Sequence, residues 1–233
     1  MFEALESASP HDPVERQRGV ADLGLEPRYN VAPTQLVPVV RREGETLHLE
    51  ALRWGMRSAA RTGDESMRAR GGKGSRLLIN ARAETVAERP SFGGAFLHRR
   101  CLILADGFYE WRGSGSRQPF YFRPQGRRSL CFAGLREGSS PGSCCLLTTQ
   151  ANAVVAAVHD RMPVVLEPQS YALWINDSIV DSASLHELLR PARSDLLDRY
   201  PVSSAVNRVA IDDPTLLEPV DEAPPPPENL RLF

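Results

Sequence analysis

The sequence predicts an α+β fold dominated by antiparallel or mixed β-sheet, and three observations lead to this class. Short runs rich in β-branched, aromatic and leucine residues recur along the chain, separated by Gly, Pro or charged turns. Helical patterns are few and short. The 233 residues with 42% apolar content suit a globular protein with a real core, and no linker separates two domains.

Eight runs are expected to form strands, because each is short, apolar and bounded by turn residues. They cover residues 35–41, 46–54, 76–82, 100–111, 119–124, 129–135, 143–149 and 162–168.

Four segments have helical patterns: a broken one over 85–98, and shorter ones over 152–159, 168–175 and 182–189. Asn152 is the expected N-cap of the second segment. Pro168 suits the first position of the third, and Ser182 is the expected cap of the fourth.

Two segments are expected to be irregular. Residues 57–76 are polar, basic and Gly-rich, which is typical of a surface loop. Residues 223–233 contain four successive prolines and are expected to form an extended tail. We therefore expect one domain over residues 1–222, followed by this Pro-rich tail.

Composition also excludes several classes of protein. No run of about 18 apolar residues occurs, so no membrane span is expected. The first residues lack a basic stretch followed by an apolar one, so no secretory signal is expected. The four cysteines show no C-x-x-C spacing, which favours reduced thiols in a cytoplasmic protein. No metal site and no cofactor are expected.

Charge is distributed unevenly along the chain. Residues 41–136 hold 19 basic against 9 acidic residues, whereas residues 137–233 hold 6 against 14. The basic middle is compatible with a face that binds a polyanion. It is equally compatible with chance, because a block of sequence need not form one surface patch, and both interpretations stay open.

The run LILADGFYEW (102–111) places a glutamate, Glu110, between Tyr109 and Trp111. A carboxylate in apolar surroundings is costly to ionise, so it is usually paired, protonated or used in chemistry. Alternation along a strand also allows Glu110 to point to water. The run alone leaves both interpretations open.

Four stretches resemble one known family when taken together. They are PRYNVAPTQ (27–35), INARAET (79–85), LADGFYEW (104–111) and VHDRMPVVL (158–166). In this order and at these separations they resemble the SOS-response-associated peptidase (SRAP) family of abasic-site processing proteins. The resemblance extends from Pro27 to Asn207. It implies a single compact domain, expected to be a monomer, with a β pseudo-barrel core.

The resemblance also implies a function in the DNA damage (SOS) response. Members of the family bind single-stranded DNA in a positive channel and act on abasic sites. Removal of the initiator Met exposes an N-terminal Cys, whose amine condenses with the ring-opened sugar aldehyde. Its thiol then closes a thiazolidine, which links the protein covalently to DNA.

Three residues of the matching motifs are the candidate catalytic groups. Glu110 is expected to shuttle protons during Schiff-base formation, which requires a carboxyl group of raised pKa near neutral pH. His159 is a second proton-transfer group. Asn80 offers an amide to orient the aldehyde or the attacking group.

Three arginines are the candidate DNA-binding residues. Arg82 lies two residues after Asn80, on the same strand face, and suits a phosphate. Arg161 follows His159 closely, and Arg28 is a weaker candidate. The alternative for these arginines is ion pairing, with Glu84 or Asp160 for example.

The chain departs from the family at its start, which reads Met1-Phe2 instead of Met-Cys-Gly-Arg. The internal cysteines cannot replace the missing one, since a thiazolidine needs thiol and free amine on one residue. We therefore expect upstream codons that encode a short further segment opening with Met-Cys-Gly-Arg. The sequence after Trp54 also lacks a second tryptophan that could stack on a base.

Two other functions stay open beside abasic-site crosslinking. One is a non-catalytic relative that binds single-stranded DNA without reacting with it. The other is a peptidase-type hydrolase in which Glu110 and His159 activate water, a function suggested only by the family's name.

Overall fold

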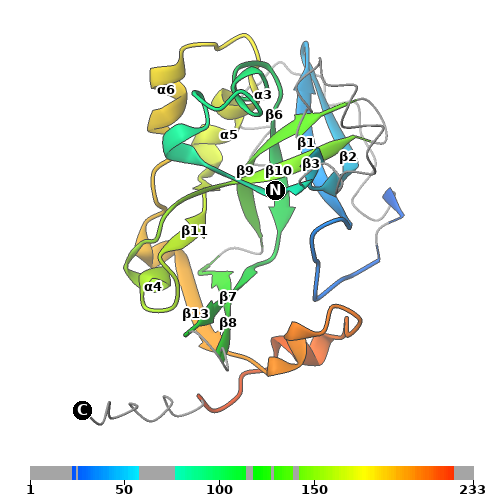
Figure 1. The fold of residues 1–233 in the computed structure, drawn as a ribbon, viewed down its shortest axis with the longest axis vertical. Coiled ribbons are helices and arrows are strands. Elements are labelled where there is room, and N and C mark those ends of the chain that lie inside the picture. Colours follow the sequence, from blue (N-terminus) through cyan, green and yellow to red (C-terminus); the bar gives the residue numbers. More distant parts are fainter. Residues whose placement is uncertain are drawn as a thin grey trace, which may run out of the picture.

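The computed structural model of the chain describes residues 23–24, 26–57, 77–113, 118–126, 129–138 and 142–222. Strands dominate this part of the chain (Figure 1). They are β1 (Leu36–Glu43), β2 (Thr46–Trp54), β3 (Met56–Arg57), β4 (Leu77–Leu78), β5 (Asn80–Arg82), β6 (Arg100–Ala105), β7 (Phe108–Arg112), β8 (Gln118–Pro124), β9 (Leu130–Glu137), β10 (Ser143–Gln150), β11 (Arg161–Pro163), β12 (Val165–Leu166) and β13 (Leu197–Pro201).

The large sheet closes on itself. Its strand order is β11-β10-β2-β1-β6-β9-β12, and a further pairing of β9 with β10 joins five of these strands into a ring. The ring is mixed, because β10 runs parallel to β2 and antiparallel to β9. Strand β5 lies beside β10, also parallel. The expected α+β class with a mixed, pseudo-barrel sheet is confirmed.

A second sheet has three strands in the order β13-β8-β7 and lies at the opposite end from α3, α5 and α6 (Figure 1). The expected single strand over 100–111 is wrong in detail, since the chain breaks at Asp106–Gly107 and enters this second sheet as β7. Strand β13 was not predicted. Its sequence, LDRYP, carries two adjacent charged residues and only one buried apolar residue, Leu197.

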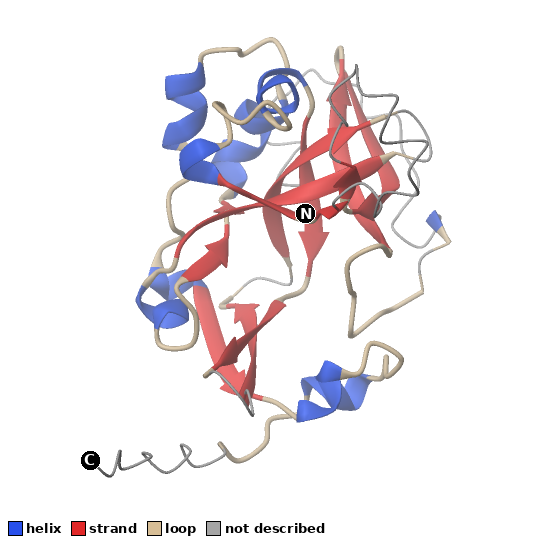
Figure 2. Ribbon diagram, viewed as in Figure 1, coloured by secondary structure: helices blue, strands red, loops and turns tan. Residues whose placement is uncertain are grey.

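Short helices complete the fold (Figure 2). Asn152 caps α4 (Ala153–Ala156) by accepting from the Val155 N–H, as expected, and α5 (Pro168–Ile175) begins at its proline. The cap of α6 (Ser182–Glu187) is Asp181 and not Ser182, because the Asp181 carboxylate accepts from two backbone N–H groups. The broken 85–98 pattern contains α3 (Gly93–His98), after η2 (Ala83–Thr85). Further 3₁₀ turns are η3 (Ser194–Leu196), η4 (Ser204–Asn207) and η5 (Pro214–Leu217).

Nearly all of the predicted loop, residues 58–76, and all of the predicted tail, residues 223–233, lie outside the described residues. Among the helices that the structure describes, none is long and apolar enough to cross a membrane.

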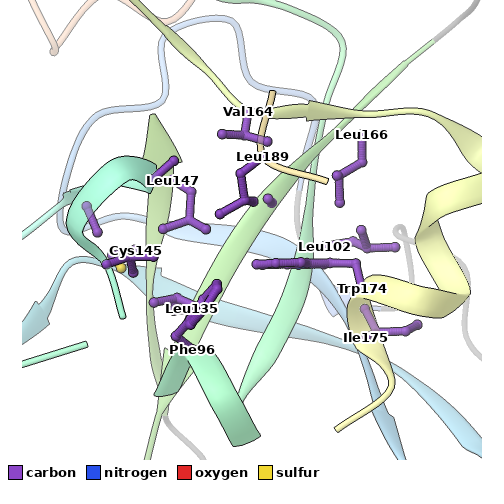
Figure 3. Packing of buried hydrophobic residues seen from close by; sticks show 14 of the residues in the cluster. Phe96, Leu102, Leu135, Cys145, Leu147, Val164, Leu166, Trp174, Ile175 and Leu189 are labelled. Atoms are coloured by element: carbon purple, nitrogen blue, oxygen red, sulfur yellow. The ribbon is translucent and has the colours of Figure 1, made fainter. Parts of the chain in front are cut away.

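Alternate residues of the ring strands enter two apolar clusters. In β6, Leu102 and Leu104 join the cluster beneath α3, α5 and α6, whereas Cys101 and Ile103 join the other. Figure 3 shows the first cluster, in which Trp174 and Phe96 pack against strand residues. Both faces of β6 are therefore buried, which explains its continuous apolar sequence.

Arg100 is a fully buried cation at the start of β6. Its guanidinium bridges the carboxyl ends of α3 and α5, where backbone carbonyls have no partner within their helix. It donates hydrogen bonds to the carbonyl oxygens of Phe96, Leu97, Trp174, Asn176 and Ile179. The side chain thereby ties both helices to the sheet.

Candidate functional site

The break between β6 and β7 depends on Gly107. A Cβ atom at this position would lie 2.4 Å from the Phe122 carbonyl oxygen and 2.4 Å from the Tyr121 ring. Only glycine permits such a close approach of the backbone to a neighbouring strand. The Asp-Gly pair therefore allows the chain to leave the ring and present the FYEW residues in the second sheet.

The side chains on one face of strand β7 form hydrogen bonds with other parts of the chain. Tyr109 donates a hydrogen bond to the Tyr29 carbonyl oxygen over 2.7 Å, and burial raises the pKa of Tyr109 to about 12, so its hydroxyl stays protonated. Trp111 donates from Nε1 to the Asn207 side chain over 2.6 Å. Glu110 lies between them in sequence and so projects from the other face.

The Tyr29–Asn30 segment is itself anchored to the C-terminal part of the described chain. The Asp212 carboxylate accepts from the backbone N–H groups of both residues. The buried Asn30 amide donates to the carbonyl oxygens of Val206, Arg208 and Ile211. The RYN motif therefore has a structural role, holding the segment against which β7 is fastened.

Glu110 and His159, which are 49 positions apart in the sequence, meet in space. Glu110 Oε2 lies 3.8 Å from His159 Nδ1, and 22% of the Glu110 side chain is exposed. Burial raises the pKa of Glu110 to about 7; His159 lowers it, and Asp160 raises it further. A carboxyl group that titrates near neutral pH, beside an imidazole, can both give and take a proton.

His159 is oriented by the strand that follows it. The backbone N–H of Arg161 lies 3.0 Å from His159 Nδ1 and can only donate, which favours the neutral tautomer with the proton on Nε2. Nδ1 also lies 3.1 Å from the Arg161 carbonyl oxygen and 3.5 Å from Asp160 Oδ1. A proton gained at Nδ1 therefore has three acceptors nearby, counting Glu110.

Asn80 and Arg82 lie together on β5. Their register partners on β10 are Leu146 and Thr148, and both side chains are exposed on one face of the sheet. Among the described residues, the Arg82 guanidinium forms no hydrogen bond or ion pair, and its charge helps to lower the pKa of Glu84. No hydrogen bond within the described ranges joins Asn80 or Arg82 to Glu110 or His159.

The other two arginines are already bonded within the protein. Arg161 makes a bidentate ion pair with Glu84, at 2.6 and 2.9 Å, and also donates to the Thr148 carbonyl oxygen over 2.6 Å. This is the ion-pairing alternative that the sequence left open. Arg28 donates to the Leu36 carbonyl oxygen. Of the three candidate arginines, Arg161 is the one whose guanidinium is mostly engaged within the described structure, whereas Arg28 makes a single hydrogen bond.

Several arginines of the basic middle of the sequence are paired or buried within the described residues. Arg100 is buried, Arg41 pairs with two glutamates, and Arg42 and Arg136 each pair with a carboxylate. Eight further basic residues of this block lie outside the described ranges. Within the described ranges, no group of three or more His, Cys, Asp or Glu side chains could hold a metal ion.

Sequence reasoning assigned no function to Glu84, Tyr29, Asn207 or Asp212. Glu84 and Tyr29 lie inside the motifs INARAET and PRYNVAPTQ, so the family resemblance already pointed to their segments. Asn207 is the last residue over which the family resemblance extends. Asp212 lies beyond that stretch and had no signal in the sequence, because it acts on Tyr29, which is 183 positions away.

The chain is similar to known proteins of one family. The profile of the SOS response associated peptidase (SRAP) family matches residues 5–209. Abasic site processing protein YoqW of Bacillus subtilis is 35% identical over 200 residues, covering 82% of this chain and 86% of YoqW. YedK of Escherichia coli, which has the same description, is 30% identical over 200 residues, covering 83% and 85%.

The fold has a counterpart among solved structures. A crystal structure of a protein from Bacteroides thetaiotaomicron matches with a TM-score of 0.71, at 22% identity, over 93% of this chain and 96% of that one. At this identity the likeness concerns the fold alone. With the profile match over most of its length and a relative at 35% identity, the chain belongs to the SRAP family.

Proposed function

We propose that this protein processes abasic sites in single-stranded DNA, as part of the response to DNA damage. The observation that carries the proposal is the Glu110–His159 pair, a carboxyl group with a pKa of about 7 placed 3.8 Å from an imidazole. The relatives named abasic site processing proteins support the choice of substrate. We further propose that the protein acts as a cytoplasmic monomer.

The proposed chemistry is proton transfer around a ring-opened sugar aldehyde. An amine adds to the aldehyde carbon and gives up a proton to His159, and the His159 imidazolium passes that proton to the alkoxide oxygen to complete the carbinolamine. Protonated Glu110 then donates a second proton to the carbinolamine hydroxyl group, which leaves as water while the nitrogen lone pair forms the protonated imine. A group with a pKa near the working pH is efficient in both directions, so the same pair can return the protons when the link is reversed.

The attacking amine and thiol must come from outside the described residues. The one lysine of the chain, Lys73, lies outside the described ranges. All four cysteines are buried, and burial raises the pKa of the Cys144 thiol to about 12, so they do not supply a thiolate. An N-terminal cysteine of the kind expected from the sequence combines both groups on one residue.

A binding experiment tests the proposal with the chain as it is. Single strands carrying a stable tetrahydrofuran abasic analogue, matched intact strands and duplexes are compared by fluorescence anisotropy. The abasic single strand is expected to bind most tightly. Equal affinity for all three, or turnover of a peptide in the absence of DNA, would contradict the proposal and favour a non-specific binder or the peptidase function.

The covalent step has its own test. A chain carrying an N-terminal Cys-Gly-Arg segment is expected to form a denaturant-resistant adduct with abasic single-stranded DNA, and the chain beginning Met1-Phe2 is not. An adduct of equal yield from both chains would show that the nucleophile lies elsewhere.

Arg82→Ala is expected to weaken binding to all single strands alike. Each phosphate contact contributes a slope of about −0.7 to the dependence of log K on log salt, so the variant should lose about that much of the slope. Arg89→Ala, which removes an exposed arginine after the η2 turn, is the matched control. Unchanged affinity and slope in Arg82→Ala would exclude the phosphate contact.

A further inference from the structure

We infer that Glu84 is a positioning residue that acts on His159 through Arg161. In this arrangement the Glu84 carboxylate holds the Arg161 side chain, and the Arg161 backbone N–H keeps His159 Nδ1 unprotonated in the neutral ring. The ring proton is thereby directed to Nε2. The inference rests on the function proposed above, in which His159 transfers protons.

The first step is the occupancy of the Arg161 guanidinium, which has five N–H bonds. One each from Nη1 and Nη2 goes to Glu84, over 2.6 and 2.9 Å, and the second from Nη2 goes to the Thr148 carbonyl oxygen. Nε is buried without a partner among the described residues. One N–H of Nη1 remains beside the buried Nε–H, so most of this guanidinium is engaged within the protein.

The second step is the pair's persistence near neutral pH. The hydrogen bond from Arg161 holds the pKa of Glu84 below its ordinary value, so the carboxylate stays ionised wherever Glu110 titrates. The Arg161 side chain is 20% exposed and that of Glu84 is 43% exposed, so solvent and salt screen the pair from the Glu84 side only. The Glu84–Arg161 ion pair therefore persists while Glu110 and His159 change their charge.

The third step connects the Glu84–Arg161 ion pair to the imidazole. Arg161 is the first residue of β11, and its backbone N–H bonds to His159 Nδ1 over 3.0 Å. On the other side, the His159 backbone N–H donates to the Val155 carbonyl oxygen at the end of α4, over 2.9 Å. His159 thus lies in a short turn that is hydrogen-bonded at both ends. The Glu84–Arg161 ion pair fixes the end at which Arg161 bonds the His159 ring.

The test uses nitrogen spectroscopy on the DNA-free protein. Long-range ¹H–¹⁵N correlation spectra, assigned with His159→Gln, report which ring nitrogen carries the proton. Wild type is expected to show the Nε2–H tautomer of His159. Glu84→Gln, which keeps the shape but removes the charge and one acceptor, is expected to move the signals towards a mixture of tautomers. Glu88→Gln changes an exposed glutamate of the same segment and serves as the matched control.

A double-mutant cycle tests whether Glu84 acts through Arg161. In the Cys-bearing chain, Glu84→Gln and Arg161→Met are each expected to slow adduct formation by about tenfold, and the double variant by no more than the larger single effect. The inference would be overturned if the effects of the two single substitutions multiplied in the double variant. It would also be overturned if Glu84→Gln showed the same His159 tautomer as the Glu88→Gln control. If no variant reacts with abasic DNA but the tautomer still shifts, the proposed function fails and the positioning role stands.

Discussion

Glu110→Gln is expected to slow the processing of abasic single-stranded DNA by about 10²–10⁴, which is the usual contribution of a positioned acid or base. Glutamine conserves the shape of the side chain but cannot donate a carboxylic proton or take one up. The rate of adduct formation in the Cys-bearing chain is the measurement. Glu88→Gln should react at the wild-type rate, and a Glu110→Gln protein that did so as well would exclude Glu110 from the chemistry.

The same substitution has a predicted effect on stability, and its sign depends on pH. Folding raises the pKa of Glu110 from about 4.5 to about 7, so the folded state binds this proton more tightly than the unfolded state. The contribution to stability is complete below pH 4.5 and is lost as pH rises through 7. The difference in the free energy of unfolding between Glu110→Gln and wild type should therefore shift in favour of the variant by up to about 3 kcal/mol between acid and pH values above 7.

Chemical denaturation of both proteins across this pH range provides the measurement. A difference in the free energy of unfolding that does not change with pH would show that Glu110 titrates as an ordinary exposed carboxyl group.

Arg100→Met is expected to lower the free energy of unfolding by about 3–5 kcal/mol. Methionine fills much of the same volume but donates no hydrogen bond. The buried carbonyl oxygens at the ends of α3 and α5 would then lose the donor that satisfies them, and helix packing on the first apolar cluster would loosen.

Arg99→Met is the control for this prediction, because Arg99 is the exposed neighbour in sequence and its replacement should change stability by no more than about 0.5 kcal/mol. Denaturant unfolding of the three proteins gives the comparison. If the two substitutions had equal effects, the hydrogen bonds of Arg100 would not be what holds the helices to the sheet.

Ring strands β6, β9 and β10 were predictable because both of their faces are buried, which makes their sequences continuous apolar runs. Strand β2 and helix α5 were predicted to the residue. The break at Gly107 was not, since the reason for it is the distant backbone of Phe122. Strand β13 was missed because its partner β8, and not its own composition, makes it a strand.

The site was predictable only in part. Family motifs brought Asn80, Glu110 and His159 to attention, and the structure adds that Glu110 faces His159 while Asn80 lies with Arg82 on another strand. The role of Arg161 could not be read from its residue type, since an arginine beside a histidine suits a phosphate or a carboxylate equally. In the structure its guanidinium bonds Glu84, which lies 77 positions earlier, and the prediction that Arg161 contacts a phosphate stays a prediction.

The most direct test of the central claim is a ¹³C titration of the Glu110 carboxyl group, recorded with and without single-stranded DNA that contains the tetrahydrofuran analogue. We predict a midpoint near pH 7 in the free protein. We also predict a change of the Glu110 signal on adding the abasic strand that the intact strand does not produce. A midpoint near 4.5, with the same response to both strands, would contradict the assignment of Glu110 as the proton-transfer group of an abasic-site processing protein.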